Sequence, residues 1–588
     1  MKVKVKYSPE VMEKILENKE NNISYNLMKG RGLLTSMLDY ELVSNPKERE
    51  EINHDPFQLK NMRRAVELFK KHIENNSKIL VIQDSDADGL CSAAIMINFI
   101  TNFCDREVSY KIHESKAHGL ESHYLEIIDE EFDFVIVPDA GSNDIKYHQA
   151  LKEHGIDILV LDHHIINEKL IPDIENYENA VIVNCTDGVY KNPHLSGGGV
   201  VLKFIQALDY EDKSVNAGEF VDLAALSIIS DMMPVVNPEN SYIIRYGLKN
   251  IRNSGFVSIL KAQEFSTKGI LTPLSIAFYV TPLINGLIRV GTMEQKDFLL
   301  QAFINGEKSI LSNKRGAAGD EMETVGEQNA RNCINCKNKQ NREKEKAIEQ
   351  LKIQIVENCL DENKILILNG NELSCPRSIM GLCAMGICAE TKIPTLLGRE
   401  NNGVLSGSIR NCDNNELKNF REFLLDSKLM EYVEGHNSAA GFSIKTSNLE
   451  KLTKYANEKL KDVDFKTNFY EVDFSFNNEE SIVDIIFNIC EHSLLWGQGN
   501  PEPIIHIKDM IINPKDIKLR SKGTYIFKHN NVDFIKFFSE EEYNEICKFE
   551  QVKISIIGTC SINNFRGVSS PQILLKEVDF YEFIDDSF

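Results

Sequence analysis

The sequence of 588 residues lacks any uninterrupted apolar run of about 18 residues, the length that a helix needs to cross a bilayer. Its first residues, MKVKVKYSPEVMEKILENKENN, lack the apolar core of a secretory signal. The hydrophobic share of 42% and the charged share of 26% are those of an ordinary soluble globular protein. These features predict a cytoplasmic location.

Cysteine pairs at metal-site spacing are also scarce. The 13 cysteines are scattered, which favours reduced thiols over a disulfide framework in so long a chain. The one CxxC pair, Cys333 and Cys336, has no second Cys or His pair nearby, and a structural zinc site needs four ligands. The sequence therefore does not favour a zinc domain. The single tryptophan, Trp496, lies in a turn-rich segment and is predicted to be packed.

The sequence also has fewer basic than acidic residues. The net charge is −22, which argues against a protein that coats DNA without specificity, because phosphate binding needs clustered Lys and Arg. An enzyme with a local basic groove remains compatible with this charge. Metal-binding carboxylates would also raise the acidic count, and bound cations would neutralise part of it.

Short apolar runs alternate with helical patterns in the first half of the chain. A chain of this length is expected to form a few domains. A helical pattern over 55–73 leads into the strand-like run KILVIQ, followed by the helix-like SAAIMINFI and by the runs FDFVIVPD, IDILVLD and AVIVN. Strands that alternate with helices and end in polar residues predict a parallel α/β sheet with its site at the strands' carboxyl ends.

The rest of the chain divides into three further patterns. A mostly helical stretch includes a charged connector, a second and smaller α/β pattern begins at KILILNG, and short β-type runs with turns in the tail predict a small all-β domain, plausibly a barrel. The predicted regions are an N-terminal segment (1–54), a catalytic α/β domain (55–260), a helical connector (261–359), a substrate-binding α/β domain (360–464) and a β-barrel domain (465–588).

Acidic and imidazole side chains follow several of the predicted strands. Asp84, Asp86 and Asp88 lie just after the first strand, Asp139 ends the second, and Asp162, His163 and His164 end the third. Each alone is compatible with a helix cap or a solvated acid. An EF-hand is excluded because position 95, where it needs a Glu, is Ile. Together, oxygen ligands with one or two imidazoles suit manganese or magnesium, and Asp231 is placed to complete the cage.

The order of these motifs resembles that of the DHH phosphoesterase superfamily. The resemblance is carried by DSDADG, VPDAG, LDHH, SGGGVVLKF and SDMMPV, and then by TPLINGLIR, RSIMGLCAMGICAETKIPTLLG and EGHNSAAGF, which are similar to the family's later motifs and its DHH-associated domain. LLWGQGNPEP and NNFRGVSSPQILLKEVDF resemble the OB-fold appendage of RecJ-like single-stranded-DNA-specific exonucleases. The resemblance covers nearly the whole chain from about Asp55.

The resemblance implies a site with two divalent cations, manganese preferred and magnesium possible. The implied metal ligands are Asp84, Asp86, Asp88, Asp139, His163 and Asp231. Asp139 would bridge both ions, a separation of roughly 4 Å that two-metal phosphoryl sites require. Asp139, His163 and His164 would be the catalytic residues, with His164 as donor or acid to the leaving oxygen. Asp162 would orient an imidazole.

The family's substrate-binding residues are carried over to the positions that match its later motifs. They are Arg289, Ser406, Arg410, Gly435, His436 and Gly441. The sequence departs from the pattern in three places: Ile288 replaces a glycine, the arginine of an SGRS-like stretch has moved to Arg410 or been lost, and an arginine expected near YKIHESKAHGL is absent, with Lys116 and His118 as the nearest substitutes. These departures concern recognition of a terminal phosphate.

Basic and aromatic residues in the tail are candidates for a nucleic-acid track, because single strands bind to basic grooves with stacking aromatics. The predicted track is Lys518, Arg520, Lys522, Phe565 and Arg566, with Lys515, Lys528, Tyr525 and Phe527 interleaved. Basic residues on the connector from Arg331 to Lys346 form a second candidate. Alternating Glu makes a solvated helix an equal interpretation there.

The sequence therefore predicts a metal-dependent exonuclease that hydrolyses single-stranded DNA, in the 5′ to 3′ direction by resemblance, and releases mononucleotides. The first alternative is an oligoribonucleotide or cyclic-dinucleotide phosphodiesterase of the same superfamily, whose members are typically shorter and lack the OB-fold appendage. The second is a non-catalytic replisome scaffold, which would have lost the metal ligands. The expected partners are single-stranded DNA and possible single-strand-binding or repair proteins, with a monomeric chain; a cellular and a viral origin are equally open.

Overall fold

The computed structural model describes residues 2–16, 23–47, 52–114, 117–212, 214–412, 415–465, 467–477, 481–565 and 567–582. The chain forms two compact units. The first unit contains Ser36–Asn341 and Leu494–Pro501, and the second contains Met1–Thr35, Arg342–Ser493 and Glu502–Phe588. The tail therefore belongs with the first residues of the chain, although the two lie at opposite ends of the sequence.

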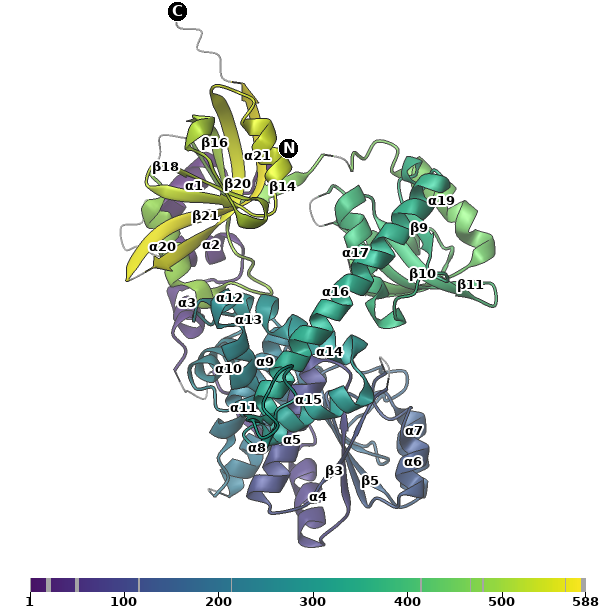
Figure 1. Cartoon of the computed structure of the whole chain (residues 1–588). Helices are drawn as coiled ribbons and strands as arrows, with labels where there is room; N and C mark the ends of the chain where they lie inside the picture. The colour runs from purple at the N-terminus through teal and green to yellow at the C-terminus, as the bar shows by residue number, and fades with distance from the viewer. Residues whose placement is uncertain are drawn as a thin grey trace, which may run out of the picture. The chain divides into compact units, whose positions relative to one another are not determined.

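The first unit is built on a parallel five-stranded sheet (Figure 1). Its strand order is β3 (Ser109–Ile112), β2 (Ile79–Gln83), β4 (Phe134–Pro138), β5 (Asp157–Asp162) and β6 (Val181–Asn184). Four of these strands and the parallel arrangement were predicted. The sequence did not reveal β3, because this edge strand is short and only partly buried, so it lacks a continuous apolar run.

Helices cover both faces of this sheet. Val135, Val137, Ile158 and Val160 pack with Ile127 and other residues under α6 (Tyr124–Asp129) and α7 (Ile145–Glu153). The alternate side chains face the other way, where the helices are α4 (Met62–Glu74), α5 (Ala87–Phe103) and α8 (Gly197–Glu211), backed by α9 (Val221–Ser230). Residues 87–100 of α5 are all buried. The site therefore sits above a rigid, close-packed core.

The remaining elements of the first unit are mostly helical, as predicted for the connector. They are α3 (Met37–Ser44), α10 (Pro238–Lys249), α11 (Ser254–Ala262), α12 (Glu264–Thr267), α13 (Pro273–Tyr279), α14 (Thr281–Val290), α15 (Met293–Asn305) and the hairpin of β7 (Ser309–Leu311) and β8 (Met322–Thr324). The long helix α16 (Val325–Glu357) begins in this unit and ends in the second. Cys333 and Cys336 are buried on α16, and no three-ligand metal group among the described residues includes them.

One helical stretch in the described part of the chain, Pro273–Val290, is long and apolar enough for a membrane span by length and composition. It comprises α13 and α14, and 56% of it is buried inside the protein. The two helices pack against α9 and α5. These contacts are those of core helices, which pass the same test.

The second unit contains a five-stranded sheet with the order β12 (Met430–His436), β13 (Ala439–Lys445), β11 (Val404–Arg410), β10 (Thr395–Asn401) and β9 (Leu366–Asn369). Its helices are α17 (Met380–Thr391), α18 (Phe420–Asp426) and α19 (Leu449–Lys459). Leu405, Ile409, Ala440 and Phe442 point to the face that α18 and α19 cover. The sequence pattern indicated β9, β10, β11 and α17 but not the hairpin of β12 and β13.

A seven-stranded sheet forms the other part of the second unit. Its order is β15 (Phe474–Asn477), β16 (Ile504–Ile512), β20 (Val552–Phe565), β21 (Val568–Glu582), β19 (Val532–Lys536), β18 (Thr524–His529) and β17 (Lys518–Arg520). The tail is not all-β as predicted, because it also forms α20 (Val483–Glu491) and α21 (Glu540–Ile546). The apolar run IVDIIFNIC has the helical spacing that would have identified α20.

The first residues of the chain join this unit by strand pairing. β1 (Lys2–Val5) pairs in parallel with β14 (Phe469–Val472), and α1 (Pro9–Leu16) and α2 (Ile23–Gly30) follow. Arg31 donates to Asp473 at 3.1 Å, and the side chain of Asp473 is fully buried.

Trp496, which belongs to the first unit, is buried, and this confirms the prediction that it is packed.

Candidate metal centre

The polar residues that end β2, β4 and β5 converge at the carboxyl edge of the parallel sheet, as predicted. Their ligand atoms form three groups, each within 4.8 Å. The groups are Asp84, Asp86 and Asp139; Asp88, His163 and Asp231; and Asp139, Asp162, His163 and His164. Because Asp139 and His163 each belong to two groups, all eight residues form one continuous site. The structure therefore brings together every residue that the sequence proposed as a metal ligand.

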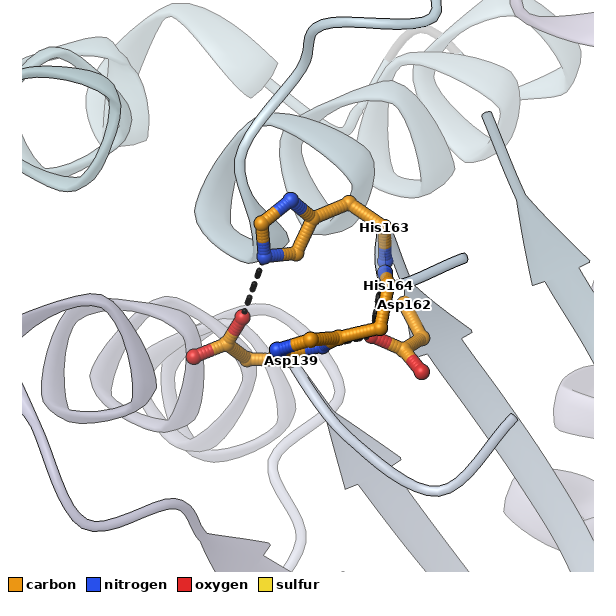
Figure 2. A group of neighbouring side chains, drawn as sticks. All are labelled: Asp139, Asp162, His163 and His164. Carbon is orange, nitrogen blue, oxygen red and sulfur yellow. Dashed lines mark hydrogen bonds and ion pairs between the residues drawn. The ribbon is translucent and has the colours of Figure 1, made fainter. Parts of the chain in front are cut away.

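Asp139 lies at the centre of this site. Its backbone has a φ of 68°, in the left-handed region, and its amide donates to the carbonyl of Leu161 at 2.8 Å. Nε2 of His163 lies 3.2 Å from Oδ1 of Asp139, and a dashed line joins the two side chains in Figure 2. That oxygen is buried and has no partner with hydrogen-bond geometry. Burial, followed by the charges of Asp88 and Asp86, raises the pKa of the Asp139 carboxyl well above its usual range.

Three further carboxylates at this edge, those of Asp84, Asp86 and Asp231, are buried with little compensating charge. Oδ1 of Asp84 is buried without a hydrogen-bond partner. Burial, and then the charge of Asp88, raises the pKa of Asp231 to about 8. Burial likewise raises the pKa of Asp86. A buried carboxylate without a counter-charge is costly, so this cluster is the arrangement expected of residues that hold cations. Carboxylate oxygens with an imidazole nitrogen suit Mn²⁺ or Mg²⁺, and the residues present fit such ions.

Asp88 differs from the other acids because hydrogen bonds surround it. Oδ1 accepts from the amide of Gly198 at 3.0 Å and from the hydroxyls of Ser92 and Ser227, and Oδ2 accepts from the amide of Gly197 at 2.9 Å. These bonds join α5, α8 and α9 at one carboxylate. Oδ2, which lies 3.8 Å from Nε2 of His163, keeps a lone pair for a cation. The predicted ligand role of Asp88 is therefore combined with an anchoring role that the sequence did not indicate.

The glycines of the SGGG stretch allow α8 to approach the metal centre. Ser196 begins the helix, and its hydroxyl accepts from the amide of Gly199 at 3.2 Å. A Cβ on Gly197 would lie 2.3 Å from Oδ1 of Asp139, and one on Gly198 would lie 2.5 Å from Oγ of Ser227. Both distances are shorter than real Cβ contacts, so a side chain at either position must displace its neighbour.

We expect Gly197→Ala to reduce cleavage about 100-fold, because a shift of about 1 Å at a catalytic group costs roughly that much. Gly319→Ala is the matched control, since a Cβ on Gly319 in the same unit meets nothing within 4 Å. Initial rates and Mn²⁺ affinity of both variants are the measurements. Equal rates for the two variants would show that Asp139 tolerates displacement.

Asp162 organises the loop that carries the two histidines. Its Oδ1 accepts from the amide of His163 at 2.7 Å and from Nδ1 of His164 at 2.8 Å (Figure 2). Its Oδ2 accepts from the amide of Ser142 at 3.0 Å. Although burial raises the pKa of Asp162, these hydrogen bonds hold it well below the usual range. The hydrogen bond to Asp162 raises the pKa of His164 to about 9. Asp162 thus orients His164 and favours the cationic form of its half-exposed imidazole.

Several residues around the metal centre could not be identified from the sequence. Ser92, Ser227 and Asn184 are ordinary polar residues without a motif of their own, and only folding brings them to the site. Asn184 donates to Oγ of Ser142 at 2.8 Å and to the carbonyl of His164 at 2.9 Å. Asn285 accepts from the amide of Ala87 at 3.1 Å, and the TPLINGLIR motif was the available signal. Arg289 lies one turn further along α14; burial lowers the pKa of its guanidinium, and the nearby charge of Asp86 acts in the opposite direction.

The predicted substrate-binding residues of the DHH-associated region lie in the second unit. Strand register places Arg410 and His436 on either side of Ala439, and Ser408 and Glu434 on either side of Gly441. Ser406, Arg410, His436 and Gly441 therefore share one face, opposite the face covered by α18 and α19. Gly435 has a φ of 130°, and its Cβ would lie 2.9 Å from Cα of Ala440. The backbone itself requires glycine at this position.

Acidic side chains lie beside some of the basic residues of the predicted nucleic-acid track. Lys518 and Arg520 are exposed on the edge strand β17, and Lys522 follows in a turn. Arg520 and Lys522 line a hollow of about 830 Å³ that is also lined by Glu540, Glu541 and Glu542. Arg566 and the side chains of Lys116 and Phe565 lie outside the described residues.

The aromatic residues interleaved with this track do not serve as stacking surfaces. Tyr525 and Phe527 are buried in the core of the sheet. On the connector, Arg331 forms an ion pair with Glu323 at 2.7 Å. The charge of this arginine is therefore already paired within the protein.

Comparison with known proteins connects both units to one family. Residues 78–228 match the model of the DHH family, N-terminal domain, and residues 472–577 match that of the RecJ OB domain. YorK of Bacillus subtilis (strain 168), an SPbeta prophage-derived protein named for single-strand DNA-specific exonuclease activity, is 34% identical over 564 residues. The match covers 94% of this chain and 95% of YorK. The single-stranded-DNA-specific exonuclease RecJ of the same organism is 25% identical over 553 residues, which cover 90% of this chain and 65% of RecJ.

A solved structure shares the fold. The crystal structure of RecJ in complex with Mn²⁺ from Thermus thermophilus aligns with a TM-score of 0.70 and 19% identity, over 99% of this chain and 80% of that one. A structure of the same protein in complex with Mg²⁺ aligns with a TM-score of 0.63 and 18% identity, over 98% and 78% of the two chains.

Proposed function

This chain belongs to the family of RecJ-like single-stranded-DNA-specific exonucleases, metal-dependent phosphodiesterases with a DHH domain, and on that premise we propose how it acts. It hydrolyses single-stranded DNA from the 5′ end and releases mononucleotides. Two divalent cations serve the reaction, and manganese is preferred. The observation that carries the proposal is the convergence of six carboxylates and two imidazoles at one sheet edge.

The sharing of ligands supports two cations rather than one. Asp84 and Asp86 group with Asp139, while Asp88 and Asp231 group with His163, whose Nε2 lies 3.2 Å from Asp139. Asp139 is thus the carboxylate that can serve both halves of the site. When bound, such a pair of ions activates a water for attack on phosphorus and stabilises the charge that develops on the phosphate.

The chain's own residues have distinct tasks in this proposal. Asp84 and Asp86 would hold one cation, His163, Asp231 and Oδ2 of Asp88 would hold the other, and Asp139 would contribute to both. His164, kept protonated by Asp162, delivers a proton from Nε2 to the leaving oxygen. Arg289 binds phosphate through its guanidinium. On the second unit, the side chains of Arg410 and His436 present donors, and Gly441, which has no side chain, leaves the same sheet face open. The chain acts as a cytoplasmic monomer.

The altered arginines bear on how the end of the strand is recognised. Ile288 precedes Arg289 where the family resemblance leads us to expect glycine, and Arg410 occupies the last position of β11. Gly381 lies so close that its Cβ would be 2.5 Å from Nη2 of Arg410. The side chain of Arg410 therefore lies beside the start of α17. We propose that it binds the terminal phosphate in place of the arginine that the family motif has at another position.

The proposal is tested with a panel of substrates in Mn²⁺. We expect release of mononucleotides from 5′-phosphorylated single-stranded DNA, with the signal of a 3′ label persisting on shortening fragments. Duplex DNA, dinucleotide RNA and cyclic di-AMP serve as comparisons and are expected to react at least about 10-fold more slowly. Turnover of the two short substrates alone would favour the oligonucleotide phosphodiesterase alternative. Inertness toward all four, with Mn²⁺ bound, would favour a scaffold.

A further inference from the structure

His118 contacts a carboxylate of the metal centre from a loop that is not part of the metal-binding motifs. Its Nδ1 lies 2.7 Å from Oδ2 of Asp84. The side chain of Asp84 is 2% exposed, while that of His118 is 50% exposed. The other oxygen of Asp84, Oδ1, is buried without a hydrogen-bond partner and belongs to the group that includes Asp86 and Asp139. One oxygen of Asp84 is thus held by an imidazole, and the other faces the cation site.

The backbone on both sides of His118 is fixed by side chains from neighbouring elements. The hydroxyl of Ser85, between two of the metal-site acids, accepts from the amide of Ala117 at 3.0 Å and donates to the carbonyl of the same residue. On the other side, Oδ2 of Asp144 accepts from the amide of Leu120 at 2.7 Å. These contacts hold the loop at the residues directly before and two after His118.

Gly119 makes the second of these anchors possible. Its φ is 64°, and a Cβ at this position would lie 2.1 Å from Oδ2 of Asp144. Further back in the loop, Nζ of the buried Lys296 donates to the carbonyls of His113 at 3.3 Å and Glu114 at 2.7 Å. Because residues 117 and 120 are held on either side of it, His118 can present its imidazole in one fixed place.

We propose that His118 is a positioning residue that fixes the Asp84 carboxylate for metal binding, and that Ser85 and Asp144 hold it in place. This inference rests on the proposed function for the identity of the ligand, a divalent cation. A carboxylate that is already oriented loses less conformational freedom when it binds the ion. Partners that hydrogen-bond to ligating carboxylates typically contribute 10- to 100-fold in metal affinity or activity.

Mn²⁺ affinity of three His118 variants tests the proposal without any DNA. Titration of the metal-free protein, followed by the electron paramagnetic resonance signal of free Mn²⁺, gives the dissociation constant. We expect His118→Ala to weaken binding by about 10- to 100-fold. His118→Asn, whose amide nitrogen occupies nearly the position of Nδ1, should stay within about threefold of wild type. His118→Gln places its amide nearer the position of Nε2 and should behave like the alanine variant.

Ser85→Ala adds an independent measurement. If Ser85 acts only by holding the loop, Ser85→Ala weakens Mn²⁺ binding, and the double variant Ser85→Ala with His118→Ala binds no more weakly than His118→Ala alone. Circular dichroism and thermal unfolding in chelator establish that each variant is folded.

Three results would overturn the inference: Mn²⁺ affinity unchanged in His118→Ala, His118→Asn as weak as His118→Ala in folded proteins, or additive losses in the double variant. A raised KM for single-stranded DNA with unchanged Mn²⁺ affinity would assign His118 to the strand instead. Failure of the wild type to degrade single-stranded DNA would refute the exonuclease function while the Mn²⁺ titrations still decide the role of His118.

Discussion

Asp139→Asn is expected to reduce kcat by at least about 10³-fold and to leave the fold intact. The carboxylate is the one that joins both halves of the metal centre, and loss of metal charge stabilisation costs several kcal/mol, at 1.36 kcal/mol for each factor of ten. Asparagine is the informative substitution because it tolerates the left-handed backbone that Asp139 adopts, with a φ of 68°.

From the sequence, Asp139→Ala is expected to abolish cleavage and to leave the fold intact, because the position is a strand end. Asp139 is buried and has a positive φ, so an alanine there would be strained as well as uncharged, and asparagine is the better test.

The stability of Asp139→Asn distinguishes a metal ligand from a structural residue. Asp139 is buried among four other acids that raise its pKa, so its removal relieves repulsion in the metal-free protein. We therefore expect an unchanged or higher Tm in chelator, together with lost activity. Asp129→Asn, an exposed acid on α6 in the same unit, is the matched control for both measurements. A variant that is inactive because it is unfolded, or one that retains full activity, would contradict the assignment.

The metal-free protein is expected to lose stability as the pH rises from 6.5 to 8, and Mn²⁺ is expected to reverse this loss. The folded state raises the pKa of Asp231 to about 8, by burial and by the charge of Asp88, and the pKa of His164 to about 9, through Asp162. In this interval the folded chain binds more protons than the unfolded chain. Its free energy of unfolding therefore falls as the pH rises.

Other groups act in the opposite direction within this interval. Burial lowers the pKa of His113, His148 and His506 to about 4, so these residues add stability until the unfolded imidazoles are fully deprotonated, somewhat above pH 6.5. The hydrogen bond with Cys383 lowers the pKa of Cys375 to about 7, and this group adds stability as the pH rises toward 8. Asp162, with a lowered pKa, loses its contribution only under acidic conditions. Burial also raises the pKa of Glu502, in the second unit, to about 7. The change of slope in Asp231→Asn relative to wild type therefore reports on the metal centre.

Thermal unfolding in chelator and in Mn²⁺, at both pH values, is the measurement. A free concentration 100-fold above the dissociation constant stabilises the folded state by about 2.7 kcal/mol, which corresponds to a Tm rise of about 5 °C or more for a large unit. The gain should be greater at pH 8, where the ligands are deprotonated. Asp231→Asn should flatten the slope in chelator. A Tm that rises with pH in chelator, or no response to Mn²⁺ at pH 8, would refute the description of these acids.

The sheet edge was predictable because its signals are local. Each of the runs KILVIQ, FDFVIVPD and IDILVLD is a buried strand, and parallel strands that end in Asp or His must deliver those side chains to one edge. The ligand set of Asp84, Asp86, Asp139, His163 and Asp231 followed from this pattern together with the family resemblance.

The supporting contacts could not be predicted in the same way. Ser227 reaches Asp88 across 139 residues of sequence, and Asn285 reaches Ala87 across 198. A serine on an apolar helix carries no signal of its partner until the helices pack. The pairing of β1 with β14 has the same origin, since the alternating KVKV matches many edge strands equally well.

Charge patterns in the tail were the least informative. Arg520 and Lys522 read as part of a basic track, yet the three glutamates that begin α21 line the same hollow. Only the fold brings residues 520 and 540 together. Tyr525 and Phe527 alternate with residues of the opposite face, as core positions of a strand do, and that periodicity was the available signal.

Anomalous scattering from crystals soaked in Mn²⁺ tests the central claim most directly. We predict two peaks at the carboxyl edge of the parallel sheet, one against Asp84, Asp86 and Asp139 and the other against Asp139, His163 and Asp231. An empty edge in a folded, Mn²⁺-soaked crystal would contradict the proposed chemistry.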